Sequence, residues 1–82
     1  MKDQIKEKLL EYVFKQSDLD NILEIPLNES LLATGVLDSF GIVELIEYIE
    51  SSWGIIIDDS DFTVEKMGSI TKMVNLIDSK LN

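Results

Sequence analysis

The stretch "GVLDSFGIVELIEYIESSWGI", residues 35–55, decides the fold because it holds both a helix start and a helical repeat of apolar residues. Asp38 is a good N-cap, since its carboxylate can accept hydrogen bonds from free backbone N–H groups and favours the positive end of the helix dipole. We therefore expect a helix that begins at Asp38 and continues to about Ser52. At about 100° per residue, its buried face consists of Ile42, Leu45, Ile46, Ile49 and Trp53, with Val43 at the edge.

The opposite face of this helix is acidic and carries a row formed by Phe40, Glu44, Glu47 and Ser51, with Tyr48 toward the same side. Phe40 directly follows Ser39, and an apolar ring among acids at a helix start is typical of a docking site for a partner protein. Alternatively, Phe40 folds back onto the preceding loop, against Leu37 or Val36, as first-turn residues often do. The sequence leaves both interpretations open.

Gly41 is an unusual residue for the first turn of this helix, because glycine inside a helix costs about 1 kcal/mol relative to alanine. Either it allows another backbone to approach Ser39 closely, or it is tolerated because the first turn is weakly constrained. The N-cap role is by itself enough to explain Asp38. Taken singly, therefore, neither residue demonstrates a functional site.

The first 38 residues and the three isoleucines after Gly54 predict one further helix, a packed loop and no convincing strand. Residues 2–16 have a helical stripe of apolar side chains, formed by Ile5, Leu9, Leu10, Tyr12, Val13 and Phe14. Residues 17–38 are long for a loop, but their many apolar residues indicate a segment that packs onto the helices, with room for a short helical turn. Residues 55–57 predict an extended apolar connection, since three residues without a pairing partner make a poor strand.

The C-terminal part predicts a short helix and a long one. Thr63 is expected to cap a turn of helix over residues 64–67, and Ser69 to cap a last helix. Apolar residues of that last helix repeat at helical spacing and are assigned to the core, namely Ile70, Met73, Val74, Ile77 and Leu81. The sequence therefore predicts an all-α fold, a small antiparallel four-helix bundle with three main helices plus one short helix. Its 82 residues, 45% of them apolar, are expected to form a single domain, residues 1–82.

Two residue types that carry much of enzyme chemistry are missing from the chain. There is no cysteine and no histidine, hence no disulfide, no thiol, no Ser-His pair and none of the commonest metal ligands. A core of this size also leaves little room for a deep active-site cleft. We therefore expect that the chain is not an enzyme.

The formal net charge of −9 is unevenly distributed, because twelve acids and no basic residue lie between Lys15 and Lys66. Such a field repels nucleic acid and anionic membranes and attracts basic protein surfaces, although a generic solvated acidic surface is the simpler explanation. The charged beginning of the chain and the lack of a long apolar run predict no signal peptide and no stable membrane insertion. We expect a cytoplasmic monomer with protein partners.

The run Asp58-Asp59-Ser60-Asp61 invites comparison with a calcium-binding loop. An EF-hand needs alternating oxygen ligands, a central glycine and a glutamate at its twelfth position. Counted from Asp58, the sixth residue is Thr63 and the twelfth is Ser69. The sequence therefore predicts no metal site in this run.

The order of these features resembles that of the phosphopantetheine-dependent carrier proteins, which include acyl, D-alanyl and peptidyl carriers. The resemblance covers nearly the whole chain. Its most specific part is Asp38-Ser39 followed by an apolar residue, then Val43-Glu44-Leu45, and Trp53 ahead of Gly54. An Asp-Ser-hydrophobe tripeptide alone is common, so its weight comes from its place at a helix start in the middle of a small domain. The resemblance implies a fold of the acyl-carrier-protein type.

The resemblance also implies that Ser39 is the attachment point of 4′-phosphopantetheine, which a separate magnesium-dependent phosphopantetheinyl transferase takes from coenzyme A. Asp38 would cap the helix and help the transferase and its metal engage. An acyl or aminoacyl group would be held as a thioester on the thiol of that arm, a thiol that this chain itself lacks. Further partners would be an acyl- or aminoacyl-activating ligase and downstream acyl-transferring enzymes, which would dock on Asp38, Phe40, Glu44 and Glu47.

Two positions depart from the fatty-acid carriers, which commonly have leucine in place of Phe40 and often an acid in place of Gly41. The stretches "LDSFG" (37–41) and "DFTVEKMGSI" (61–70) look closer to D-alanyl, peptidyl and stand-alone biosynthetic carriers. We therefore favour a discrete carrier of an amino acid or small acyl group over a general fatty-acid carrier. An unmodified acidic helical protein-interaction domain and an acidic ion-binding module are the alternatives from other classes.

Overall fold

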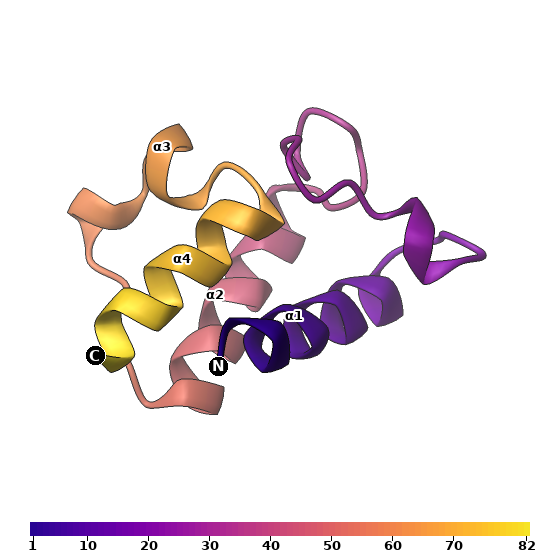
Figure 1. Ribbon diagram of the computed structural model, residues 1–82. Coiled ribbons are helices and arrows are strands. Elements are labelled where there is room, and N and C mark those ends of the chain that lie inside the picture. Colours follow the sequence, from indigo (N-terminus) through magenta and orange to yellow (C-terminus); the bar gives the residue numbers. More distant parts are fainter.

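A computed structural model describes the backbone of residues 1–82 and the side chains of residues 1–63 and 66–82 (Figure 1). Over these residues the chain forms six helical segments, in the order α1 (Lys2–Gln16), the 3-10 turn η1 (Ile22–Glu24), α2 (Ser39–Trp53), the 3-10 turn η2 (Asp59–Asp61), α3 (Val64–Met67) and α4 (Ile70–Leu81). No β-strand occurs in this described backbone, which confirms the all-α prediction.

Helix α2 begins at the predicted N-cap and ends close to the predicted residue. Asp38 is its N-cap, and the Asp38 Oδ1 atom accepts a hydrogen bond of 2.7 Å from the backbone N–H of Gly41. At the other end Gly54 adopts the left-handed conformation with φ of 64°, which glycine reaches without steric cost, and its N–H donates to the Glu50 carbonyl. The helix therefore extends one residue beyond the predicted Ser52.

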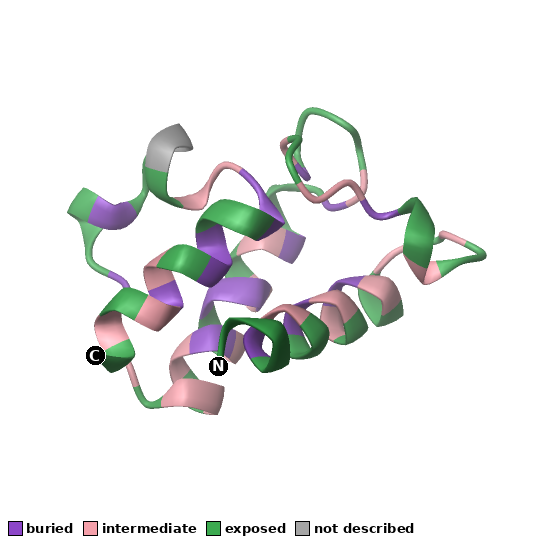
Figure 2. Ribbon diagram, in the orientation of Figure 1, coloured by how far each residue is buried: buried purple, intermediate pink, exposed green. Residues whose placement is uncertain are grey.

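The core lies between the three long helices, because α1 contacts both α2 and α4, and α2 also contacts α4. In Figure 2 the buried residues form purple bands on the inward sides of these helices. The predicted stripes supply this core: Ile5, Leu9 and Val13 from α1, Leu45, Ile46 and Ile49 from α2, and Ile70, Met73, Val74 and Ile77 from α4. Ile42 and Trp53 are half-buried at its edge.

Two side chains lie elsewhere than predicted. Leu81, which was assigned to the core, is 36% exposed because it is the last residue of α4 and little of the molecule extends beyond it. Tyr48 was placed toward the outer acidic side of its helix, but it is half-buried and stacks on Tyr12 of α1, with ring centroids 4.2 Å apart. The neighbouring helix α1 therefore covers this side of α2, which a helical wheel of α2 alone cannot show.

The connection between α1 and α2 packs onto the helices, as its apolar residues predicted. Ile25, Leu31 and Leu37 are buried, whereas Leu23 and Leu32 remain exposed. The predicted helical turn is η1, which is capped by Asn21, and the carbonyl of Leu27 accepts a hydrogen bond from the N–H of Thr71 at the start of α4. The bond from Thr71 holds the long loop against the beginning of α4.

The connection between α2 and α4 also follows the sequence prediction. Residues 55–57 are extended, and the N–H of Ile57 donates a hydrogen bond of 2.9 Å to the Glu50 carboxylate. The Thr63 hydroxyl caps α3 by accepting from the N–H of Lys66, and the Ser69 hydroxyl caps α4 by accepting from the N–H of Lys72. Each predicted cap is therefore confirmed by a hydrogen bond.

Candidate functional site

Ser39 is the first residue of α2, and it is exposed. The carbonyl of Asp38 accepts the first hydrogen bond of the helix, from the N–H of Ile42, while the Asp38 carboxylate turns toward Gly41. This geometry fixes the start of the helix at one residue and presents the Ser39 side chain at the surface. A primary hydroxyl in this position is accessible to another protein.

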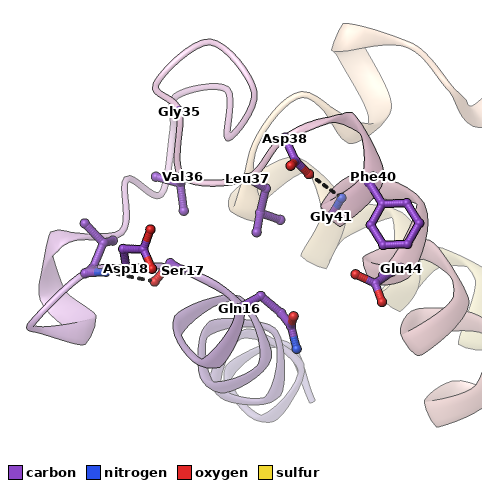
Figure 3. Close-up of a pocket in the computed structure, with 11 residues that line it drawn as sticks. Gln16, Ser17, Asp18, Gly35, Val36, Leu37, Asp38, Phe40, Gly41 and Glu44 are labelled. Atoms are coloured by element: carbon purple, nitrogen blue, oxygen red, sulfur yellow. Dashed lines mark hydrogen bonds between the residues drawn. The ribbon is translucent and has the colours of Figure 1, made fainter.

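A surface pocket of about 420 Å³ lies beside this helix start (Figure 3). In this view the end of α1 and the residues after it form the lower side, through Gln16, Ser17, Asp18 and Leu19, and the segment from Gly35 to Asp38 forms the upper side. Phe40, Gly41 and Glu44 of α2 complete the lining. The pocket thus joins apolar surface to carboxylates from two separate parts of the chain.

Phe40 is 70% exposed, so it does not bury itself against the preceding loop. It lines the same pocket as Val36 and Leu37, and Figure 3 shows its ring on the α2 side of that pocket. Of the two interpretations that the sequence left open, the outward-facing ring is the one that the structure contains.

Gly41 has a third role that neither sequence interpretation included. The residue is buried, and a Cβ atom built on it would lie 3.3 Å from the Asp38 Oδ1 atom and 3.4 Å from the Leu37 Cβ atom. The missing side chain therefore lets the capping carboxylate and the Leu37 side chain pack directly onto the first turn of α2. The close contacts at this helix start are therefore made by Leu37 and Asp38, the two residues before α2.

The two acids predicted to dock partners follow Phe40 along α2. Glu47 is exposed and Glu44 is half-buried. Burial raises the pKa of the Tyr12 phenol above its ordinary value, and the negative charges of Glu44 and Glu47 raise this pKa further. The negative charges of Glu44 and Glu47 therefore reach Tyr12 on the side of α2 that borders α1, where Tyr12 stacks on Tyr48.

Comparison with known proteins identifies relatives over most of the chain. This chain is 36% identical over 70 residues to the D-alanyl carrier protein of Streptococcus pyogenes serotype M5 (strain Manfredo). The match covers 85% of this chain and 86% of that protein. The D-alanyl carrier proteins of serotype M49 (strain NZ131) and serotype M1 match with the same identity and coverage. The chain belongs to the carrier protein family that contains these relatives. No protein-family profile matches it, and no solved structure matches it with significance.

This carrier protein also contains an ionic cluster that the sequence did not predict. Asp61, the last residue of η2, is only 5% exposed, and its carboxylate lies 2.9 Å from Lys80 Nζ and 3.4 Å from Lys66 Nζ. The hydrogen bond from Lys80 is the main cause that holds the pKa of Asp61 below its ordinary value, and a bond from the Asp58 N–H acts in the same direction.

The sequence contained one signal for this arrangement, the spacing of Asp58 and Asp61, which permits a capping box. The structure forms it, because the N–H of Asp58 donates to the Asp61 carboxylate. In the run Asp58–Asp61, for which the sequence predicted no metal site, the most buried carboxylate is bound to lysines. Among the described residues of the carrier protein, no three potential metal ligands come together, and no helix is long and apolar enough to cross a membrane.

Proposed function

We propose that Ser39 carries a 4′-phosphopantetheine arm and that the chain holds an acyl or aminoacyl group on this arm as a thioester. The observation that carries the proposal is the exposed Ser39 hydroxyl at the first position of α2, directly after a well-formed Asp38 cap, in a member of the carrier protein family. The fold we propose for the whole chain is accordingly a single antiparallel four-helix carrier domain of the acyl-carrier-protein type.

The amino-acid composition agrees with a chain that carries the acyl group while the bound arm supplies the thiol and a separate enzyme attaches the arm. A thioester carrier needs a thiol, and the chain has no cysteine, so the bound arm supplies the thiol. Ser39 needs no activating histidine, and the chain has none, because Ser39 acts as the substrate of a phosphopantetheinyl transferase that brings the general base and the magnesium ion. The chain itself is then a carrier and not an enzyme.

The start of α2 suits a phosphodiester on Ser39. The first backbone N–H groups of a helix lack partners within the helix and favour an anion. The Asp38 carboxylate engages the N–H of Gly41, which leaves the amides of Ser39 and Phe40 as the remaining donors of the first turn. Asp38 thereby orients the helix end, and its charge lies where a transferase with its metal would approach.

Partner enzymes are proposed to dock on Asp38, Phe40, Glu44 and Glu47. These residues combine an exposed aromatic ring with carboxylates along one side of α2, next to Ser39. Acidic side chains accelerate encounter with a basic surface, and an exposed aromatic ring adds apolar contact area once the partners meet. The partners are the transferase, an activating ligase and the downstream enzymes that accept the acyl group.

The cargo that we propose is an amino acid or a small acyl group, with D-alanine as the first candidate. The support is the name of the relatives, which are D-alanyl carrier proteins, together with glycine at position 41. A general fatty-acid carrier is the alternative subtype. Parallel loading assays distinguish the two, one with a D-alanine-activating ligase, D-alanine and ATP, and one with a fatty-acid-activating ligase, octanoate and ATP.

Attachment of the arm is tested by mass spectrometry of the purified chain after incubation with coenzyme A, magnesium and a broad-specificity phosphopantetheinyl transferase. We expect a mass gain of one phosphopantetheinyl group in the wild type and no gain in Ser39→Ala. Ser51→Ala, a matched change of an exposed serine on α2, should be loaded like the wild type. An unchanged wild-type mass with several transferases would instead support an unmodified interaction domain.

A further inference from the structure

The pocket beside Phe40 lies next to the point from which a group on Ser39 would extend. Its volume of about 420 Å³ is within the range of small-molecule sites, about 300–1,000 Å³. Asp38 and Phe40, the residues before and after Ser39 in the chain, both line it. A flexible arm on Ser39 therefore starts beside this pocket and can fold back into it.

The lining of this pocket combines apolar surface with negative charge. Apolar side chains line it at Val36, Leu37 and Phe40. Carboxylates come from Asp18, just after α1, and from Glu44 of α2, and Figure 3 shows them on opposite sides of the pocket. Within the described part of the chain, no lysine forms a salt bridge with either of these two carboxylates. The pocket therefore suits a small group that is partly apolar and positively charged.

A second pocket near Ser39 differs from this one in charge. It has a volume of about 230 Å³ and is bordered by Ile42, Phe62 and Met67, and none of its described lining residues is charged. A charged group that enters such an apolar site loses hydration without gaining a partner. A cationic group on the arm is therefore expected to favour the pocket beside Phe40.

The arm makes even a weak attraction to these carboxylates effective. One exposed ion pair changes an equilibrium by only about two- to fivefold. A short flexible tether, however, makes the contact intramolecular and raises the effective concentration of its end to roughly the millimolar range. Two weak ionic contacts can then hold a measurable fraction of the cargo in the pocket.

We propose that the pocket beside Phe40 binds the ammonium group of an aminoacyl cargo through Asp18 and Glu44, while the small apolar part of the cargo lies against Phe40. The inference rests on the proposed function, because the cargo reaches the pocket only when Ser39 carries the arm. An acyl group without an amine gains no such attraction. The pocket thus retains an amino acid at the surface of the carrier in preference to a simple acyl group.

The test compares two stable loaded forms of the full chain by backbone NMR. A phosphopantetheinyl transferase attaches arms from coenzyme A analogues that end in D-alanine or in propionate, each joined through an amide in place of the labile thioester. The two cargoes differ by one amino group, which is charged at mildly acidic pH. The chain has 4 glycines, of which Gly35 and Gly41 line the proposed pocket, Gly68 lines the apolar pocket and Gly54 lines neither.

We expect the amide signals of Gly35 and Gly41 to differ between the D-alanyl and propionyl forms by more than those of Gly54 and Gly68. Equal signals of the two forms at Gly35 and Gly41 would overturn the inference, although the arm would still be attached. A difference that is largest at Gly68 would also overturn it, because the charged cargo would then occupy the apolar pocket.

The role of the two carboxylates is tested by removing one charge at a time. Asp18→Asn and Glu44→Gln should each reduce the difference between the two forms at the pocket glycines by about two- to fivefold. Asp20→Asn is the matched control, because Asp20 is exposed and close in the chain but does not line the pocket, and it should leave the difference unchanged. An equal reduction in Asp20→Asn would show that net charge alone is responsible and would overturn the inference.

Failure of the inference is distinguishable from failure of the proposed function. Mass spectrometry shows whether the arm is attached to Ser39 before any cargo is compared. If no arm can be attached, the proposed function fails and the inference fails with it. If the arm is attached and the two cargoes give the same spectra, only the inference fails.

Discussion

The start of α2 and the corner around Asp61 each depend on one aspartate, but the two aspartates act over different distances in the chain. Asp38 is exposed, and its carboxylate bonds to the backbone of Gly41 within the same helical turn. Asp61 is buried, and its main partner, Lys80, belongs to the end of another helix. The start of α2 is formed by contacts between residues that are close in the sequence. The corner around Asp61 instead joins segments that come together only in the folded chain.

The largest expected effect concerns the core on which both regions rest. Ile49→Ala should reduce the free energy of unfolding by about 2–5 kcal/mol, because Ile49 is fully buried between the helices and its truncation leaves a cavity. Val43→Ala on the exposed side of the same helix should change it by less than about 0.5 kcal/mol. Chemical denaturation measures both values, and similar losses for the two variants would show that the buried face is wrongly assigned.

The next effect separates the two roles given to Asp38. Asp38→Ala should cost about 1 kcal/mol of stability through loss of the cap, while Asp38→Asn should keep most of it, since asparagine caps about as well as aspartate. If the charge of Asp38 also assists the transferase, the transferase should attach phosphopantetheine to Asp38→Asn more slowly than to the wild type, although the variant is nearly as stable. Loading of Asp38→Asn at the wild-type rate would limit Asp38 to a structural role.

The pH dependence of stability provides a comparable test at Asp61. Its pKa in the folded protein lies below the ordinary value of 3.8, so folding favours the ionised carboxylate. This contribution is fully present above 3.8 and is lost as the pH falls through the folded pKa. The pKa of Lys80 is raised above 10.5, so its contribution is fully present below that value and is lost as the pH rises through the folded pKa.

The measurement is the difference in unfolding free energy between the wild type and Asp61→Asn across the acidic range. We expect a constant difference at neutral pH that shrinks toward zero at the acidic end, where both chains carry an uncharged side chain at position 61. Asp59→Asn should show a much smaller dependence, because Asp59 is exposed. A difference that stays constant into the acidic range would contradict the role given to the Asp61 charge.

The smallest effect on stability is expected at the acidic surface of α2. Glu47→Lys should change stability by less than about 0.5 kcal/mol, because Glu47 is exposed. It should nevertheless slow loading by partner enzymes by about two- to tenfold at low salt. The difference in rate from the wild type should decrease as salt screens the charges. Glu7→Lys, an equal change of net charge on exposed surface of α1, should load at nearly the wild-type rate. Equal slowing of both variants would point to net charge alone.

The sequence predicted the start of α2 well because its signals are local. The Asp38 cap and the helical spacing after it each depend on neighbouring residues, and the structure contains both. Ser69 and Thr63 were predicted as caps for the same reason. The outward position of Phe40 was one of two interpretations that the sequence left open, and the structure contains it.

The features that the sequence did not predict depend on contacts between elements. Tyr48 is covered by α1, so its position requires the packing of two helices. Asp61 looked like one acid in an acidic run, and only the approach of α4 brings Lys80 to it. Gly41 is explained by the side chains of Leu37 and Asp38, the two residues before α2, whose positions no helical wheel describes.

The most direct test of the central claim is site-localised mass spectrometry of the protein purified from its own host. Peptide fragmentation should place a phosphopantetheinyl group on Ser39, bearing an amino acid or small acyl group on its thiol when the sample is quenched quickly. An unmodified Ser39 in protein from growing cells, or a phosphopantetheinyl group on another serine, would contradict the account.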